Sequence, residues 1–230
     1  MRLVLVRHGA TPNNLDARFT GQSDIAMSEL GERQAAALAA RLASRLAARR
    51  FDTLVSSDLA RARGTAERLA AALSLPLQFD PDLREVGMGE WEGRSVAEVA
   101  ARYRHALAAW ERDPIRFAPP GGESLEQFVA RIRRSLARWT NGSAGDTVLM
   151  VTHGGVIGVA VCLALGLPLD FRRRIGRDNT SITELELDRA VEGEGGMPLA
   201  PRNAHLVRLN DTAHLEGLMQ PGEGEAHQVL

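Results

Sequence analysis

Four short segments of the chain place an arginine, a histidine or a glutamate just after an apolar run or in a loop. They are Arg7-His8-Gly9, Asp58 through Arg61, Leu83-Arg84-Glu85 and His153-Gly154-Gly155. In an open α/β sheet, ligands bind in the crevice outside the carboxyl ends of the strands. Guanidinium groups match the geometry of oxyanions, so two arginines and two histidines that converge there would form a pocket for a dianion.

His8 and His153 each end an apolar run and are followed by glycine. Neighbouring side chains of a regular strand point to opposite faces, so Arg7 and His8 can share a site only if Gly9 lets the backbone leave the strand. The two glycines after His153 open a predicted helix, whose first amide groups can bind an anion. An exposed Arg-His pair and a turn histidine are the structural alternatives, and the residues alone do not say which histidine would be a nucleophile.

Arg61 falls in the first turn of a helix that we expect to be capped by Ser57 or Asp58. A cation at a helix N-terminus opposes the macrodipole, which favours a ligand-binding role for Arg61. Arg63, by contrast, is predicted to lie on the solvated surface.

Three carboxylates could act as a general acid, because Glu85, Glu90 and Glu92 lie within eight residues of one another. Chemistry alone does not choose among them. Glu90 and Glu92 flank Trp91 and are predicted to lie on the surface of a loop.

The composition excludes several classes of protein and site. The 28 basic residues are all arginines, so a Schiff-base lysine and a phosphate-loop lysine are impossible. The net charge of -1 gives no reason to expect nucleic acid or an anionic membrane as a partner. Cys162 is the single cysteine, which excludes a disulfide framework. We expect no metal and no cofactor, and we leave a homodimer open.

Targeting and membrane signals are also missing from the sequence. The first apolar run is too short for a signal peptide. The longest apolar stretch, residues 156–167, contains two glycines and is shorter than the roughly 18 residues that a spanning helix needs. We therefore expect a cytoplasmic protein.

Apolar periodicity predicts an alternation of strands and helices, which favours an α/β fold. We expect a three-layer sandwich, with a largely parallel sheet flanked by helices and a small helical insertion, about 94–124, as a lid. Residues 1–216 would form a single domain and residues 217–230 a flexible tail. A Gly/Pro-rich loop is predicted at 193–201. The predicted strands are 3–6, 51–55, 75–79, 147–151, 181–187 and 205–209, and the predicted helices are 28–50, 59–73, 96–110, 125–139 and one ending at 165.

In chain order, these motifs resemble those of the histidine phosphatase (phosphoglycerate-mutase-like) superfamily. The similarity runs from Leu3 to about Leu187. The chain departs from many relatives at Ala10, where they carry Glu, and at Gly64. The matching blocks are Leu5-Val6-Arg7-His8-Gly9-Ala10-Thr11 with Asn14, Gly21-Gln22-Ser23-Asp24, Ser28-Glu29-Leu30-Gly31, Ser56-Ser57-Asp58-Leu59-Ala60-Arg61-Ala62, Leu83-Arg84-Glu85 through Trp91-Glu92-Gly93, and Val151-Thr152-His153-Gly154-Gly155.

The resemblance implies a reaction and a role for each matched residue. His8 would attack phosphorus and become a phosphohistidine, and Glu85 would protonate the leaving alkoxide. The cationic groups would replace a metal, so none would be needed. The phosphoryl oxygens would be held by Arg7, Arg61 and His153, together with Asn14, Gly21, Gln22 and the Gly154 amide.

Three functions share these motifs. Cofactor-dependent phosphoglycerate mutases carry a longer insertion, rich in Lys and Arg, that binds the substrate carboxylate. Here residues 94–117 lack Lys, and Pro120-Gly121-Gly122-Glu123-Ser124 looks like the phosphatase branches. Arg102, Arg104, Arg112 and Arg116 are interpreted mainly as the polar face of the insertion helix. The resemblance therefore favours a phosphomonoesterase for a small phosphorylated substrate, with a mutase and a non-catalytic phospho-ligand-binding relative as alternatives.

Overall fold

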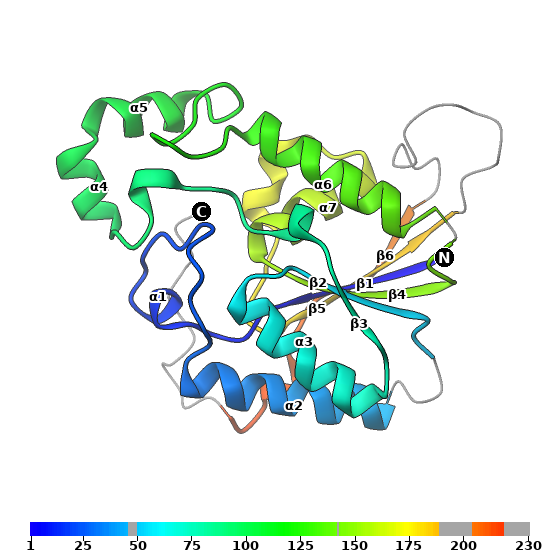
Figure 1. Cartoon of the computed structure of the whole chain (residues 1–230). Helices are drawn as coiled ribbons and strands as arrows, with labels where there is room; N and C mark the ends of the chain where they lie inside the picture. Colours follow the sequence, from blue (N-terminus) through cyan, green and yellow to red (C-terminus); the bar gives the residue numbers. More distant parts are fainter. Residues whose placement is uncertain (46–49, 142, 189–203, 219–230) are drawn as a thin grey trace.

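A computed structural model of the chain describes residues 1–45, 50–141, 143–188 and 204–218. Six strands in these ranges form one sheet in the order β3-β2-β4-β1-β5-β6 (Figure 1). The pairs β3/β2, β2/β4 and β4/β1 are parallel, whereas β5 runs antiparallel to both β1 and β6. The strands are β1 (Arg2–Arg7), β2 (Thr53–Ser56), β3 (Leu77–Phe79), β4 (Thr147–Thr152), β5 (Ile182–Leu187) and β6 (Ala204–Asp211).

Helices cover both faces of this sheet, because its central strands are apolar on both sides. Alternate residues of β1 and β4 enter two different cores, with Leu5 and Met150 in one and Val6 and Val151 in the other. The first core packs against α6 (Leu125–Trp139) and α7 (Gly154–Leu165), and the second against α2 (Glu29–Arg45) and α3 (Ala60–Leu73) (Figure 1). The predicted three-layer α/β fold is thus confirmed.

The parallel strands β1, β2 and β4 end at the same edge of the sheet. Their registers pair Arg7 with Thr152, and Ser56 with Val151. The chain continues from these ends into His8, Ser57 and His153. Two backbone hydrogen bonds hold the exits together, since the amides of His8 and Ser57 donate to the carbonyls of Thr152 and Val151 at 3.0 Å each.

The insertion differs from the single helix predicted at 96–110. It contains α4 (Val96–Arg102) and α5 (Arg104–Arg112), separated at Tyr103, whose φ of -123° and ψ of 33° are not helical. The Tyr103 hydroxyl donates to Glu90 at 2.9 Å and its ring lies beneath the guanidinium groups of Arg94 and Arg102. These contacts give Tyr103 a tertiary position that a continuous helix would not provide.

A third, smaller core lies beneath the insertion and holds Phe19, Met88, Trp91 and Val99. The Trp91 ring contacts Trp110 of α5 edge to face at 5.6 Å between centroids. The remaining short elements are α1 (Pro12–Leu15), η1 (Pro81–Leu83), η2 (Gly89–Trp91), η3 (Leu169–Arg174) and η4 (Ala213–Leu215).

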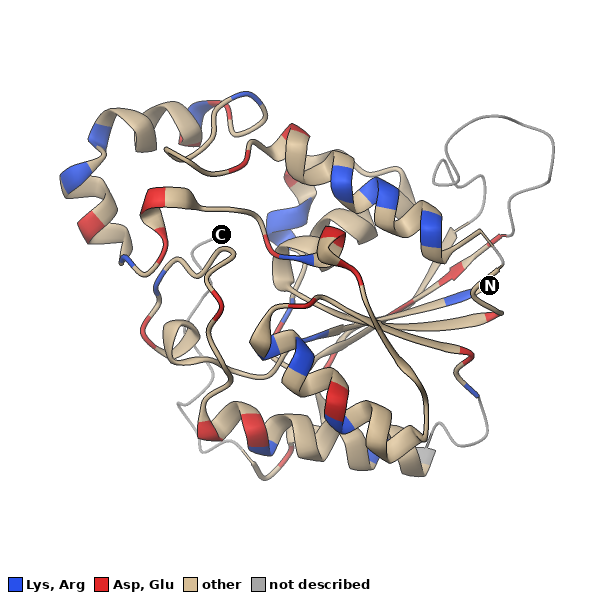
Figure 2. Cartoon of the chain, in the orientation of Figure 1, with Lys and Arg blue, Asp and Glu red and all other residues tan. Residues whose placement is uncertain are grey.

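Some predicted segments lie outside the described residues. These are the loop at 193–201, positions 46–49 of the first long helix, and the tail at 217–230 except for its first two residues. Basic and acidic residues are interspersed along the drawn helices and loops (Figure 2). Among the described helices, none is both long and apolar enough to cross a membrane.

Candidate active site

A cavity of about 120 Å³ opens at the edge of the sheet where β1 ends. Of the nine residues predicted for the site, six line it and three do not. His153, Gln22 and Gly154 are outside the lining, although Gly155 belongs to it. The six lining residues are Arg7, His8, Asn14, Gly21, Arg61 and Glu85.

His8 presents one ring nitrogen to this cavity. Its Nδ1 lies 2.8 Å from the carbonyl oxygen of Gly9, and because a carbonyl only accepts, Nδ1 carries the proton. Nε2 therefore holds the lone pair of the neutral ring. Burial lowers the pKa of His8 well below its usual value, and the charges of Arg61 and Arg7 lower it further. The ring is thus neutral, with an available lone pair, at pH 7.

The backbone at Gly9 lets Arg7 and His8 line the same cavity. A Cβ atom at Gly9 would lie 2.5 Å from the carbonyl oxygen of Gly31 and 2.7 Å from Sδ of Met27, so only glycine fits there. The Gly9 amide donates to Oγ1 of Thr65 in α3 at 3.0 Å. The chain that leaves β1 is therefore held directly against α2 and α3.

Arg7 and Arg61 are buried, and both donate to backbone carbonyls. Arg7 donates to Arg177 at 2.6 Å, and Arg61 donates to Ser23 and Gly21 at 2.8 Å each. Their Nε atoms have no hydrogen-bond partner among the described residues. Burial lowers the pKa of each to about 10, with Glu85 opposing the shift. Both remain charged at neutral pH and hold unpaired N–H donors, which is the state expected of a binding site for an oxyanion.

The start of α3 corrects the predicted cap. The N-cap residue is Leu59, and neither Ser57 nor Asp58 caps the helix through its side chain. The carboxylate of Asp24 instead accepts a hydrogen bond from the Ala60 amide at 2.6 Å. A local pattern could not reveal this cap, because Asp24 comes from a distant loop.

His153 lies directly behind His8, with 5.1 Å between the ring centroids. It is fully buried, its Nε2 lies 2.9 Å from Oγ of Ser57, and its Nδ1 has no partner among the described residues. Burial lowers the pKa of His153 well below its usual value, as does the charge of Arg61. The two histidines thus form a neutral pair flanked by arginines.

Glu85 is the one carboxylate of its loop that lines the cavity. Its Oε1 accepts a hydrogen bond from the Val86 amide, and its Oε2 accepts one from the Gly155 amide, both at 2.9 Å. Glu90 is exposed and pairs with Tyr103. Glu92 accepts from the amides of Gln22 and Met88. The structure therefore places Glu85 in the cavity lining and the other two carboxylates outside it, a distinction that the sequence did not make.

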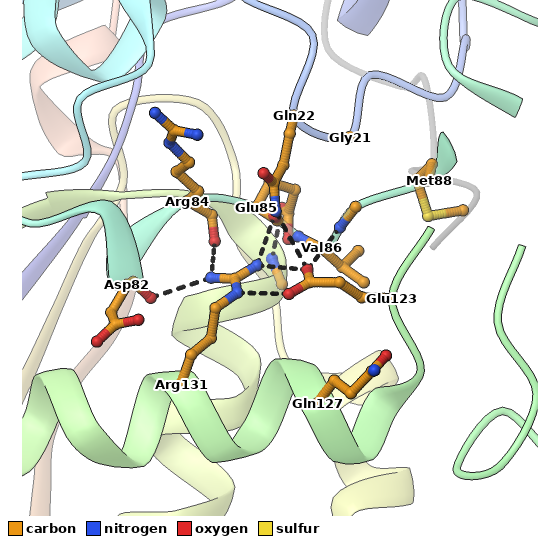
Figure 3. A network of polar contacts seen from close by, with 12 residues as sticks. Gly21, Gln22, Asp82, Arg84, Glu85, Val86, Met88, Glu123, Gln127 and Arg131 are labelled. Carbon is orange, nitrogen blue, oxygen red and sulfur yellow. Dashed lines mark hydrogen bonds and ion pairs between the residues drawn. The ribbon is translucent and has the colours of Figure 1, made fainter. Parts of the chain in front are cut away.

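A partly buried ion pair that sequence reasoning missed holds the segment 82–93 that contains Glu85, here called the acid loop. Arg131 of α6 donates to the carbonyl oxygens of Asp82, Arg84 and Glu85 (Figure 3). It also contacts Glu123 through Nε and Nη2, at 2.8 and 2.7 Å. Glu123 in turn accepts from the Gly87 amide at 2.8 Å and from the Gln22 side chain at 3.2 Å. This network also explains why Gln22, predicted to bind phosphate, is turned toward Glu123.

Sequence reasoning also missed two residues of the loop before β5, Asn179 and Thr180, which contact the backbone of Arg7 and His8. The Thr180 amide donates to the carbonyls of Arg7 and His8 at 3.0 and 3.2 Å. The Asn179 side chain donates to the His8 carbonyl at 3.0 Å and to Oδ1 of Asn14 at 3.3 Å. Thr180 has a φ of 58°, a conformation that a non-glycine residue adopts rarely. This strained turn fixes the main chain beneath His8.

The described residues contain no group of three or more His, Cys, Asp or Glu side chains arranged to hold a metal ion. The donors around the cavity are instead guanidinium, imidazole and backbone amide groups. These groups bind anions.

Known proteins share both the sequence and the fold. Residues 3–192 match the model of the histidine phosphatase superfamily (branch 1). A glucosyl-3-phosphoglycerate phosphatase from Mycolicibacterium vanbaalenii is 38% identical over 203 residues, which cover 85% of this chain and 88% of that protein. A protein from Erwinia tasmaniensis named a probable phosphoglycerate mutase is 35% identical over 190 residues, covering 81% of this chain and 85% of its own length.

A solved structure agrees with this sequence similarity. The α-ribazole phosphatase from Shigella flexneri superposes with a TM-score of 0.80 at 27% identity, covering 93% of this chain and 98% of its own. The resemblance that the motifs indicated is thereby confirmed. The chain belongs to branch 1 of the histidine phosphatase superfamily and is an enzyme of that superfamily.

Proposed function

We propose that this enzyme is a metal-independent phosphomonoesterase of the cytoplasm, which hydrolyses small phosphorylated metabolites through a phosphohistidine on His8. The observation that carries the proposal is the tethered ring of His8. Its Nδ1–H group is held by the Gly9 carbonyl, and the ring lines a cavity that it shares with Arg7 and Arg61. A neutral imidazole beside two fixed cations is suited to attack an anionic phosphate ester.

The phosphoryl oxygens would bind the donors that the protein leaves unpaired. Two of these donors, Nε of Arg7 and Nε of Arg61, belong to residues that line the cavity. The third is Nδ1 of His153, which carries a proton when Nε2 accepts from Ser57 and which would reach a phosphoryl oxygen only after a shift of the ring, because His153 lies behind His8 outside the lining. Fixed donors of this kind stabilise the charge that the transition state spreads over the equatorial oxygens. Supporting contacts are assigned to Asn14 and Gly21, which line the cavity. The resemblance also implies contacts from Gln22 and the Gly154 amide, and Gln22 would have to release Glu123 to make its contact.

The reaction would proceed in two balanced steps. In the first, Nε2 of His8 attacks phosphorus, the ester P–O bond breaks, and the protonated carboxyl group of Glu85 gives its proton to the leaving alkoxide. In the second, water attacks the phosphohistidine while the Glu85 carboxylate takes a proton from it. The P–N bond then breaks, and inorganic phosphate, neutral His8 and protonated Glu85 are formed.

A panel of phosphate esters tests this function. We expect phosphate release from several phosphorylated metabolites, at a rate unchanged by EDTA. Activity that EDTA removed and a divalent ion restored would contradict the metal-independent mechanism. 3-Phosphoglycerate with 2,3-bisphosphoglycerate belongs in the same panel. Isomerisation faster than phosphate release would assign the mutase function instead, and tight binding without turnover would assign the non-catalytic one.

Replacing Gly155 with alanine is expected to displace the general acid. A Cβ atom at position 155 would collide with Oε1 of Glu85, whose other oxygen accepts from the Gly155 amide. We expect kcat for an alkyl phosphate to fall by roughly tenfold to a hundredfold, up to the lower end of what general acid catalysis contributes.

Gly64→Ala is the matched control, because a Cβ atom there meets only the flexible end of Met27. Steady-state kinetics of both variants, with thermal melts to verify folding, make the comparison. Equal activity of Gly155→Ala and the wild-type enzyme would show that Glu85 need not occupy its present position.

A further inference from the structure

The cavity has more basic groups than a phosphate group requires. Of its six arginines, Arg7 and Arg61 serve the phosphoryl group in the proposed function, and Arg18 donates to Glu98 at 3.0 Å. Of its two acids, Glu123 is paired with Arg131 outside the lining. The lining thus contains three further arginines, Arg172, Arg173 and Arg177, against the single carboxyl group of Glu85.

These three arginines come from the segment that follows α7. Arg177 is engaged, since it donates to the Gly154 carbonyl at 3.3 Å. Arg172 is buried and donates to the Leu169 carbonyl at 3.0 Å through Nη1. Arg173 is exposed at the cavity, with its guanidinium carbon 5.3 Å from the ring centroid of Trp110. Stacking on an indole ring orients a guanidinium group and leaves its N–H edge free to donate.

Among the described residues one acid acts on this part of the lining, because the charge of Asp170 raises the pKa of Arg172, but burial and the charge of Arg173 outweigh it. Among the residues that the structure describes, neither Arg172 nor Arg173 forms an ion pair with a carboxylate. Burial lowers the pKa of Arg172 and the charge of Arg173 lowers it further, as expected for two cations held close together. A ligand anion would relieve both the burial and the repulsion.

The rest of the lining suits the carbon skeleton of an alcohol. Phe19, Trp110 and Phe128 contribute aromatic side chains to the cavity. The arginines of the insertion do not contribute, because Arg102, Arg104, Arg112 and Arg116 are all absent from the lining. Any second charge on a bound ester would therefore meet the segment after α7.

We propose that the leaving group of the substrate carries a second anionic group, a carboxylate or a further phosphate, bound by Arg172 and Arg173 beside Trp110. This inference rests on the proposed function and names its substrate class. The phosphate ester would lie with phosphorus at His8, its carbon chain against the aromatic side chains, and its second anion at the two arginines.

The experiment compares pairs of esters that differ in one charge. 3-Phosphoglycerate has a carboxylate where glycerol 3-phosphate has a hydroxymethyl group, and fructose 1,6-bisphosphate has one phosphate more than fructose 6-phosphate. Each compound is measured as a competitor of p-nitrophenyl phosphate hydrolysis, so that its Ki is obtained whether or not it is turned over. In at least one pair, we expect the compound with the second anionic group to have a Ki at least about tenfold lower than that of its partner compound for the wild-type enzyme. This is the size of one charge-assisted hydrogen bond.

Arg173→Gln is expected to reduce that selectivity ratio to near one, and Arg172→Gln to reduce it in the same direction. Arg174→Gln is the matched control, because Arg174 lies in the same segment and stacks on Phe171, but is not part of the cavity lining. It should keep the wild-type ratio. Selectivity within the 3-phosphoglycerate pair would identify the second anion as a carboxylate, and selectivity within the fructose bisphosphate pair would identify it as a phosphate.

Equal Ki values within both pairs, or a ratio that survives Arg173→Gln, would overturn the inference and leave the proposed function intact. If the wild-type enzyme did not hydrolyse p-nitrophenyl phosphate at all, the proposed function would fail instead. The same pairs would then be titrated calorimetrically against the wild-type enzyme and Arg173→Gln, and the ratio of Kd values would decide on the second anion site.

Discussion

Replacing His8 with alanine is expected to abolish the phosphoenzyme and to lower kcat by about 10⁴-fold or more, the scale seen when a catalytic nucleophile is removed. The proposed chemistry requires a neutral nitrogen with a lone pair facing the substrate, and burial beside two guanidinium groups keeps His8 in that state. His153 is a poor substitute because its Nε2 lies against Ser57 and its ring is outside the cavity lining.

The measurement is covalent labelling with a ³²P-labelled ester, quenched in base, since a phosphohistidine survives base and is lost in acid. The wild-type enzyme should give an acid-labile label and His8→Ala none. His105→Ala serves as the control, because His105 is exposed on α5 and should label like the wild type. Circular dichroism verifies that each variant is folded. Labelling of His8→Ala at wild-type stoichiometry would mean that another side chain is the nucleophile.

Arg61 was recognisable from the sequence because of its position at the start of a helix. A cation in the first turn of a helix opposes the macrodipole, which pointed to a use outside the helix. The structure places the Arg61 guanidinium against the carbonyls of Gly21 and Ser23. Its neighbour Arg63 is exposed, as predicted.

Elements with an uninterrupted local pattern were the ones that the sequence predicted well. α6 spans the predicted 125–139 because its apolar positions face one core and Ser124 caps its start with Gln127. β4 was predictable because it is an unbroken apolar run, as expected for a strand that is buried on both faces. The break at Tyr103 was not predictable, because contacts with Glu90, Arg94 and Arg102 hold that residue outside a continuous helix.

The candidate site divides in the same way. Arg7, His8 and Arg61 lie at a strand end or a helix start, so their types and places indicated a ligand, whereas Glu85 lies in a loop and was chosen over Glu90 and Glu92 only by the family resemblance. Asn179 and Thr180 are more than 160 residues away in the sequence and donate to the main-chain carbonyls of Arg7 and His8, at and just after the end of β1. A local sequence pattern does not reveal such main-chain partners.

Arg131 was missed although the sequence contains a signal for it. It lies on the buried side of α6 three residues after Phe128 and four before Ser135. An arginine on the apolar face of an amphipathic helix needs acceptors inside the protein. The carbonyls of the acid loop and the Glu123 carboxylate provide those acceptors.

Substituting glutamine for Glu85 is expected to make the rate depend strongly on the leaving group. Glutamine keeps the size of the side chain but cannot give a proton to an alkoxide. For an alkyl phosphate we expect kcat to fall by about 10²- to 10³-fold, the usual contribution of a general acid. The leaving group of p-nitrophenyl phosphate departs without a proton, so its first step does not need the acid. For this ester kcat should fall by about tenfold or less, because the substitution then slows only the second step, in which the carboxylate takes a proton from water.

Glu90→Gln is the control for this prediction, because Glu90 comes from the same loop and pairs with Tyr103 instead of lining the cavity. It should leave both substrates close to wild-type rates. Equal slowing of the two esters by Glu85→Gln would indicate that Glu85 serves only to anchor the Val86 and Gly155 amides, since a lost anchor affects every substrate and a lost proton only those that need it. The leaving-group dependence of the rate thus distinguishes an acid from a structural carboxylate at the same position.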